Sequence, residues 1–292
     1  YKPTAKDAKA ILSRLTEATE EGVLVKTLLR YGSVPKTDNI TALLMDIGNS
    51  IVKWGVLDGG LIQSISSVTH EKINNVGFSS ITTSIPRKVD RVIASNVAGT
   101  NFAVRLSAAI GIHCQSDINF VTSAKSAFGI KNAYKNPRQF GVDRWVALVG
   151  ARSEFRSSLC VVDIGTAVTI DVINKDGKHI GGQIIPGIEL MEHVLSDETS
   201  NIKSAKRMLK DPLKGTSMFA DNTKMAIQNG SVNAISGAIE RVIGTLRSDG
   251  YKPNVIVTGG DAPRILKQFD DQLIYRPHLI LQGLAYIVQN EG

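Results

Sequence analysis

Hydrophobic and polar positions alternate with short periods along residues 41–292, and this pattern predicts an α/β protein. Short apolar runs bounded by Gly, Asp or Asn are typical of strands, whereas apolar residues three or four positions apart are typical of helices. The predicted strands are 41–48, 51–59, 91–97, 118–123, 158–165, 166–173, 179–185 and 255–260. The predicted helices are 102–111, 144–155, 187–197, 222–248, a segment that starts near Ala262, and 282–290.

The stretches LLMDIGNSIVKWGVL (43–57) and VVDIGTAVTIDVI (161–173) share one design. In each, an apolar strand ends in an Asp-x-Gly turn with small polar residues, and a second strand follows. An unpaired carboxylate inside a buried strand would cost several kcal/mol, so the acidic residue indicates that the strand ends at a binding site. The repeat predicts two similar α/β lobes, residues 41–155 and 156–292, whose turns meet at a cleft.

Residues 1–40 have a different character. Apolar residues recur at helical spacing around Ile11 and Leu28, and Gly32 and Pro35 follow them. We predict a helical extension of two short helices and a linker, in which no residue indicates chemistry.

Composition and charge narrow the class of protein. The 292 residues, 42% of them hydrophobic, are those of a globular protein, and no run approaches the ~18 apolar residues of a membrane span. No secretory signal is visible, and two cysteines, Cys114 and Cys160, suit a reducing cytoplasm. The net charge of +7 fits acidic partners such as nucleotides. The basic run 202–214 lacks aromatic residues that stack on bases, and the histidines lack ligand spacing, so neither nucleic acid, membrane nor zinc is expected.

The two Asp-x-Gly turns have the properties of a phosphate site. A glycine near the aspartate allows a tight turn whose backbone N–H groups form an anion-binding concavity. Asn49, Ser50 and Thr166 would add side-chain donors. One such turn alone is usually an ordinary hairpin turn, but its recurrence favours nucleotide binding. Because neither G-x-x-x-x-G-K-[ST] nor G-x-G-x-x-G occurs, a nucleotide site here would be of the two-lobe kind.

Three charged residues beside the turns extend this interpretation. Asp46 and Asp163 have the wrong sign to contact phosphate, and they fit a cation that shares carboxylate, water and phosphate oxygens. Lys53, on the second strand of the first hairpin, could reach a terminal phosphate as a point charge.

Five short motifs in a fixed order carry a resemblance to a known family. They are DIGNS (46–50), GVDRW (141–145), DIGTAVTID (163–171), GGQIIPG (181–187) and TGGDA (258–262). Together they resemble type III pantothenate kinase, a family that also includes proteins called Bvg accessory factors. Its superfamily contains sugar kinases, acetate kinases and Hsp70 ATPases, so the resemblance implies two duplicated RNase H-like (actin-like ATPase) lobes with mixed sheets flanked by helices.

The resemblance also implies an activity. The family uses ATP with Mg²⁺ to phosphorylate the 4′-hydroxyl of pantothenate, the first committed step toward coenzyme A. A monovalent cation, potassium or ammonium, and a homodimer are further implications.

Site residues follow from the same resemblance. The ATP phosphates would lie at Asp46, Ile47, Gly48, Asn49, Ser50, Ile51, Val52, Lys53 and Thr166, with the adenosine near TGGDA. The monovalent cation would lie at Asp163. Pantothenate would lie at Tyr134, Gly141, Val142, Asp143, Arg144 and Thr223.

Asp143 is the predicted catalytic residue, because a carboxylate beside the 4′-hydroxyl can orient it and accept its proton. Read locally, Asp143 is instead the N-cap of a helix that begins at Arg144. Arg144 is either a surface residue of that helix or a bidentate partner for the carboxylate of pantothenate. Tyr134 is equally a half-buried loop residue, and Asp171 is interpreted as a strand-exit residue rather than a cation ligand.

Residues 1–40 depart from the family pattern. They could be the tail of an upstream domain or an extension without a role, since some relatives are fused behind a biotin-protein ligase. Two other functions are open: a regulatory protein that retains the fold without turnover, and an actin-like enzyme for another alcohol or polyphosphate. The presence of Asp46, Lys53, Asp143 and Asp163 argues against the first, and the GVDR segment against the second.

Overall fold

The computed structural model describes residues 40–198, 218–269 and 273–291, with side chains omitted at 196–198. Residues 39–292 belong to one compact unit. The helices predicted before residue 40 and the basic run 202–214 lie outside the described residues.

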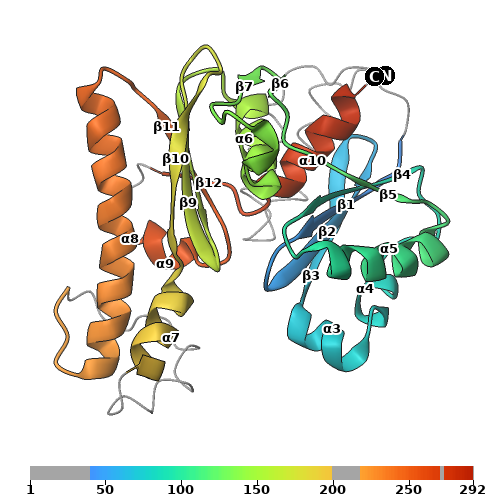
Figure 1. Cartoon of the computed structure of the whole chain (residues 1–292), viewed down its shortest axis with the longest axis horizontal. Coiled ribbons are helices and arrows are strands. Elements are labelled where there is room, and N and C mark those ends of the chain that lie inside the picture. Colours follow the sequence, from blue (N-terminus) through green and yellow to red (C-terminus); the bar gives the residue numbers. More distant parts are fainter. Residues whose placement is uncertain (1–39, 199–217, 270–272, 292) are drawn as a thin grey trace, which may run out of the picture. The chain divides into compact units, whose positions relative to one another are not determined.

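The described residues contain two five-stranded sheets with the same topology (Figure 1). The first has five strands in the order β3-β2-β1-β4-β5, and the second has five in the order β10-β9-β8-β11-β12. In each sheet the first three strands of the chain pair antiparallel, and the last two run parallel to the first. The bounds in the first sheet are β1 Ala42–Ile47, β2 Ile51–Asp58, β3 Leu61–Thr69, β4 Arg91–Asn96 and β5 Ile118–Phe120. Those in the second are β8 Leu159–Ile164, β9 Ala167–Ile173, β10 His179–Pro186, β11 Asn254–Thr258 and β12 Ile274–Tyr275.

This duplication confirms the predicted internal repeat and the α/β fold class. The residues between the strands form helices, two short strands and one 3₁₀ turn. The helices are α3 His70–Val76, α4 Ser79–Thr82, α5 Thr100–Cys114, α6 Val142–Glu154, α7 Ile188–Glu198, α8 Thr223–Ser248, α9 Ala262–Leu266 and α10 Leu279–Asn290. The remaining elements are β6 Ser126–Ala127, β7 Ile130–Lys131 and η1 Pro137–Gln139.

The side chains of β1 show how the two faces of a sheet are used. Leu43 and Met45 pack in a cluster with α5, whereas Leu44 packs on the other face with residues of α6 and α10. Successive residues of a strand point to opposite faces, so a fully apolar strand is buried on both sides. The second sheet is covered on its outer face by α8 (Figure 1). Arg264 of α9 donates to Glu192 of α7 at 2.8 Å.

Helices α6 and α10 pack against each other through glycines. A Cβ on Gly150 would lie 2.6 Å from the carbonyl oxygen of Leu279, and one on Gly283 would lie 2.2 Å from that of Val146. Only residues without side chains allow so close an approach of two helix backbones. One cluster of buried residues runs from β1 through α6 and α10 to β8, so α6 is held by both sheets. The predicted lobe boundary after residue 155 follows the end of α6, and this division remains a prediction.

Candidate active site

The two Asp-x-Gly turns meet in the structure. Each follows a central strand, with Asp46 paired across the hairpin with Lys53, and Asp163 paired with Thr169. In both turns the glycine N–H donates back across the turn, from Gly48 at 3.1 Å and from Gly165 at 3.1 Å. The hydroxyl oxygens of Ser50 and Thr166 lie 2.8 Å apart and share a hydrogen bond, although 116 residues separate them. The convergence expected from the repeat is therefore present.

Three carboxylates and one ammonium group interact at this meeting point. The pKa of Asp46 is raised to about 7, chiefly by burial and then by the charge of Asp163; the charge of Lys53 opposes this shift and that of Asp143 adds to it. Burial also raises the pKa of Asp163 to about 6, with Lys53 opposing and Asp143 reinforcing the shift. The positive charge of Lys53 does not offset the burial and mutual repulsion of these carboxylates, because the pKa values of Asp46 and Asp163 stay raised. A bound cation, or a cation–phosphate complex, would reduce the repulsion.

Asp143 lies in the first turn of α6. The helix begins at Val142 with Gly141 as its N-cap, so the interpretation of Asp143 as the N-cap is wrong. The Asp143 carboxylate accepts a hydrogen bond from the Arg144 backbone N–H at 2.7 Å. A Cβ at Gly141 would lie 2.7 Å from the same oxygen, so glycine leaves room for this carboxylate. Burial raises the pKa of Asp143, although that hydrogen bond and the Arg144 charge oppose the shift.

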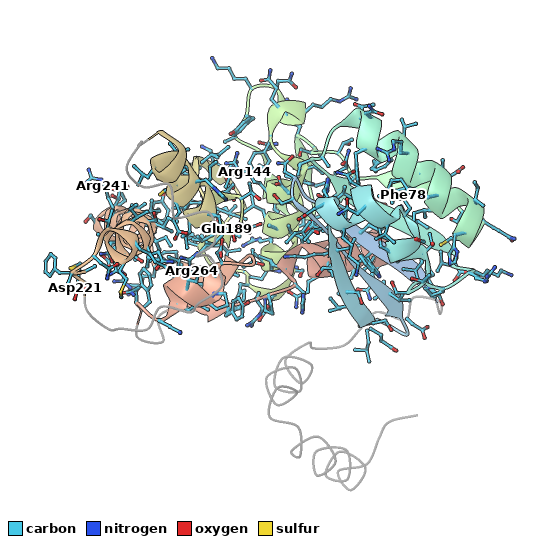
Figure 2. The ribbon with its side chains drawn as sticks, turned by 90° about the horizontal axis from the view of Figure 1, so that it is seen from below. Phe78, Arg144, Glu189, Asp221, Arg241 and Arg264 are labelled. Atoms are coloured by element: carbon cyan, nitrogen blue, oxygen red, sulfur yellow. The ribbon has the colours of Figure 1, made fainter. Side chains whose placement is uncertain are left out.

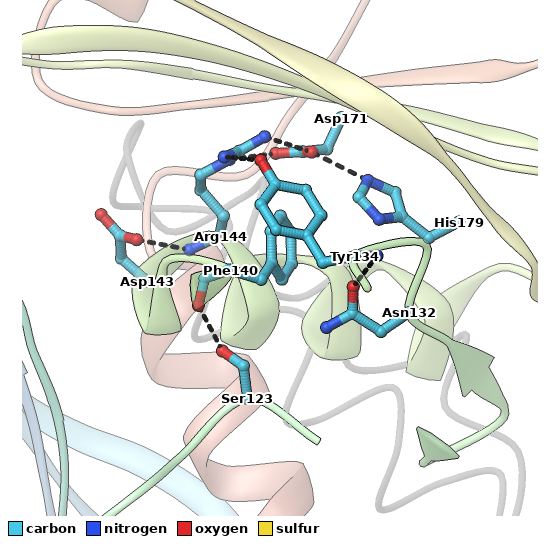
Figure 3. A network of polar contacts seen from close by, with 8 residues as sticks. All are labelled: Ser123, Asn132, Tyr134, Phe140, Asp143, Arg144, Asp171 and His179. Carbon is cyan, nitrogen blue, oxygen red and sulfur yellow. Dashed lines mark hydrogen bonds and ion pairs between the residues drawn. The ribbon is translucent and has the colours of Figure 1, made fainter. Parts of the chain in front are cut away.

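Arg144 lies in the interior, whereas Asp221, just before α8, and Arg241, on α8, lie exposed (Figure 2). Only 6% of Arg144 is exposed, so its interpretation as a surface residue is wrong. Its Nε and Nη2 donate to the two carboxylate oxygens of Asp171, each at 2.7 Å, and Nη1 donates to the Tyr134 hydroxyl at 3.2 Å (Figure 3). Burial acts to lower the pKa of Arg144, but the bonds and charge of Asp171 outweigh it and raise the pKa.

Asp171 was expected at a strand exit, and this expectation is wrong. It lies inside β9 with 2% of its surface exposed, and its carboxylate also contacts His179 Nε2 at 3.0 Å. The sequence interpretation failed because the partner of Asp171 lies 27 residues away, on another element. Tyr134 is half-buried beside this pair, as one of its two interpretations has it.

The glycine motifs have packing roles. A Cβ on Gly182 of GGQIIPG would lie 2.2 Å from Asp171 Oδ1 and 2.6 Å from Arg144 Nη2, so glycine is needed where this ion pair crosses β10. Gly259 of TGGDA has φ +99°, and its Cβ would lie 2.2 Å from the Ile164 carbonyl oxygen at the end of β8. A Cβ on Gly260 meets nothing within 4 Å, which leaves the space needed for a ligand close to the backbone.

Two residues fall outside this pattern. Thr223 begins α8 with an exposed side chain, and no hydrogen bond or ion pair within the described segments joins it to the residues above. His278, which sequence reasoning did not select, lies at the N-cap of α10, and burial and then the charge of Lys53 lower its pKa. No local signal marks His278, because its neighbour Lys53 is on a distant strand.

Comparisons with known proteins agree with this geometry. The family model for type III pantothenate kinase matches residues 42–245. A type III pantothenate kinase of Nitrosococcus oceani is 36% identical over 257 residues, which cover 85% of this chain and 94% of the relative. One of Aromatoleum aromaticum is 34% identical over 254 residues, covering 86% of this chain and 98% of the relative.

Solved structures match the fold. A Campylobacter jejuni protein described as a transcriptional activator of the Baf family has a TM-score of 0.52 and 21% identity, over 85% of this chain and 98% of that one. The ethanolamine utilization protein EutJ of Carboxydothermus hydrogenoformans has a TM-score of 0.51 and 14% identity, over 87% of this chain and 91% of that one. The duplicated sheets thus define an actin-like α/β fold. Within that fold, the chain belongs to the type III pantothenate kinase family.

Proposed function

We propose that this chain transfers the γ-phosphoryl group of ATP to the 4′-hydroxyl of pantothenate, giving ADP and 4′-phosphopantothenate for coenzyme A synthesis. Family membership supports the reaction. The observation that carries the assignment of residues is the convergence of Asp46, Lys53, Asp143 and Asp163 where the two turns meet. These residues come from both lobes, as a triphosphate lying between them requires.

The ATP phosphates would lie against the hairpin of residues 46–53 and against Thr166. Gly48 N–H is already bonded across the turn, so the turn's other backbone N–H groups would form the anion-binding concavity, and Lys53 would supply the positive charge. Ser50 and Thr166 would exchange their mutual hydrogen bond for bonds to phosphate oxygens. Adenosine would lie near TGGDA, where Gly260 leaves open space.

The raised pKa values of Asp46 and Asp163 fit cation binding, because a bound cation stabilises both carboxylates as anions. In this proposal Asp46 binds Mg²⁺ with the phosphates, and Asp163 binds potassium or ammonium. Magnesium, when bound, neutralises charge on the phosphoryl oxygens during transfer.

Asp143 is the proposed general base. Its carboxylate would accept the 4′-hydroxyl proton while the hydroxyl oxygen bonds to the γ-phosphorus and the bond from phosphorus to the bridging oxygen breaks. Its raised pKa makes it a stronger base than an ordinary carboxylate.

Pantothenate would contact Tyr134, residues 141–144 and Thr223. The Nε and Nη2 edge of Arg144 is occupied by Asp171, so a substrate carboxylate would have to meet the Nη end of the guanidinium. This restricts the predicted bidentate contact to one orientation.

The proposal also covers the cellular location and the oligomeric state of the enzyme. A cytoplasmic homodimer fits ATP as substrate and two buried free cysteines, Cys114 and Cys160. In the described part of the chain, no helix is long and apolar enough to cross a bilayer. Residues 1–40 could be the end of an upstream fused domain.

A direct assay tests the activity. Purified protein with ATP, Mg²⁺, K⁺ and pantothenate should form ADP and 4′-phosphopantothenate in equal amounts, followed by mass spectrometry. The same mixture without pantothenate is the control for background hydrolysis. ADP formation that does not depend on pantothenate, or no turnover by folded protein, would reject the proposal.

A further inference from the structure

A buried polar network begins at Arg144, the residue that follows the proposed base in α6. Arg144, the residue after Asp143, is clamped by Asp171 of β9, and Asp171 in turn contacts His179 of β10 (Figure 3). The exposed fractions are 6% for Arg144, 2% for Asp171 and 0% for His179. Neither Asp171 nor His179 is among the residues proposed to contact ATP or pantothenate.

Contacts on several sides hold the Arg144 side chain in place. The guanidinium of Arg144 stacks over the Phe140 ring at 4.6 Å, and its Nη1 donates to Tyr134. On the other side, Gly182 leaves no space for even a methyl group beside the ion pair. Arg144 is therefore held at its Nε–Nη2 edge, at Nη1 and over one ring face, so its side chain cannot move without breaking buried contacts.

This rigidity has a consequence for Asp143. The Arg144 backbone N–H donates to the Asp143 carboxylate at 2.7 Å, so the position of one residue fixes the other. A buried ion pair is often no more stabilising than apolar residues of the same volume, which makes fold stability a weak explanation for this one. The pair links the first turn of α6 to the second sheet, which carries Asp163.

We propose that Asp171, oriented by His179, is a positioning residue that acts through Arg144 to hold the Asp143 carboxylate in line with the acceptor hydroxyl. This inference rests on the proposed function, in which Asp143 is the base.

The charge of Asp171 has a second effect, because it raises the pKa of Asp143. The other charged groups that face Asp143 are Arg144 on its own helix, Asp46 on β1 and Asp163 on β8. In Asp171→Asn the raising charge is lost while the Arg144 charge remains. The pKa of Asp143 should then fall, and the acid limb of kcat at saturating Mg-ATP should move to lower pH.

The first experiment compares Asp171→Asn with a matched control that removes the acidic partner of a different, half-buried arginine, at the other end of α6 from Asp143. Glu154, the last residue of α6, forms a bidentate pair with Arg276, whose Nε donates at 2.8 Å. Glu154→Gln breaks that pair at the far end of α6. Asp171→Asn should lower kcat by up to about 100-fold, with KM for ATP changed less than about twofold. Glu154→Gln should retain kcat despite a lower melting temperature. Unchanged kcat in Asp171→Asn, or an equal loss in both variants, would overturn the proposal.

A second pair of variants works even if Asp171→Asn does not fold. His179→Gln keeps an N–H donor near the position of Nε2, whereas His179→Leu keeps the volume without it. The Gln variant should retain most of kcat and the Leu variant should lose it, with similar melting temperatures. Equal kcat in the two variants contradicts the orienting role of His179. Asp143→Asn run in parallel separates the two ideas: if it turns over normally, the base assignment fails, whereas a failure confined to positions 171 and 179 leaves the base intact.

Discussion

Asp46 gives a quantitative test of the site, because its burial should destabilise the free protein above neutral pH. Its pKa in the folded state is about 7, against 3.8 for an ordinary carboxyl group. Between these values the folded state holds a proton that the unfolded chain has lost, so the free energy of unfolding falls as pH rises. The contribution of protonated Asp46 to the free energy of unfolding is fully present below about pH 4 and is lost as the pH rises through about 7.

The size of the effect follows from the two pKa values. Each pKa unit corresponds to about 1.4 kcal/mol, so ionisation of Asp46 would lower the free energy of unfolding by about 4 kcal/mol between pH 4 and pH 8. Asp46→Asn removes this charge. We expect the variant to be more stable than the natural sequence at pH 8, with about 4 kcal/mol as the upper limit, and to lose that advantage at pH 4.

Urea unfolding without nucleotide or Mg²⁺ measures this directly. The buried side chains of Trp54 in β2 and Trp145 in α6 supply a fluorescence signal for unfolding. Asp58→Asn, at the exposed end of β2, is the matched control for loss of one negative charge. If Asp46→Asn is less stable than the natural sequence at pH 8, or if the difference between them does not depend on pH, the buried cluster of repelling carboxylates is refuted.

Three further predictions follow from the site and the fold. Asp143→Asn should lower kcat by about 10²–10⁴-fold and leave the binding of Mg-ATP, measured by calorimetry, nearly unchanged; near-normal turnover would reject the general base. Replacement of K⁺ by Na⁺ should lower the rate of the natural sequence, and equal initial rates in both salts would remove the monovalent-cation role of Asp163. Gly283→Ala places a Cβ 2.2 Å from the Val146 carbonyl oxygen, and should lower the free energy of unfolding in urea by about 1–3 kcal/mol; an unchanged value would contradict the close packing of α6 and α10.

The elements predicted well are those whose burial is visible in the local sequence. β1 and β8 are buried along nearly their whole length, and a continuous apolar run reports this directly. The edge strand β3 was not predicted, because LIQSISSVT is mostly exposed and lacks the apolar pattern of a strand. The short helices α3 and α4 were missed for a related reason, since each buries one residue.

The two Asp-x-Gly turns show what a repeat can add to local patterns. Neither turn alone distinguishes a phosphate site from an ordinary hairpin, but duplication predicts that the two turns occupy equivalent positions in two similar sheets. The contact between Ser50 and Thr166 is the structural counterpart of that prediction. A pattern that repeats across the chain can therefore predict a long-range contact that neither copy contains.

Asp171 shows where such reasoning stops. Asp171 lies two residues after the partner of Asp163 in its hairpin, and the residue two after Lys53, the partner of Asp46, is Gly55. The first sheet therefore has no second aspartate from which a role for Asp171 could be inferred. Its role depends on Arg144 of α6 and on the missing side chain of Gly182, and these three come together only through the tertiary fold. Symmetric features of this protein could be predicted from sequence because duplication constrains them twice. The network of Arg144, Asp171 and His179 breaks the symmetry between the two sheets, as expected if Asp143 is the one base of the proposed site.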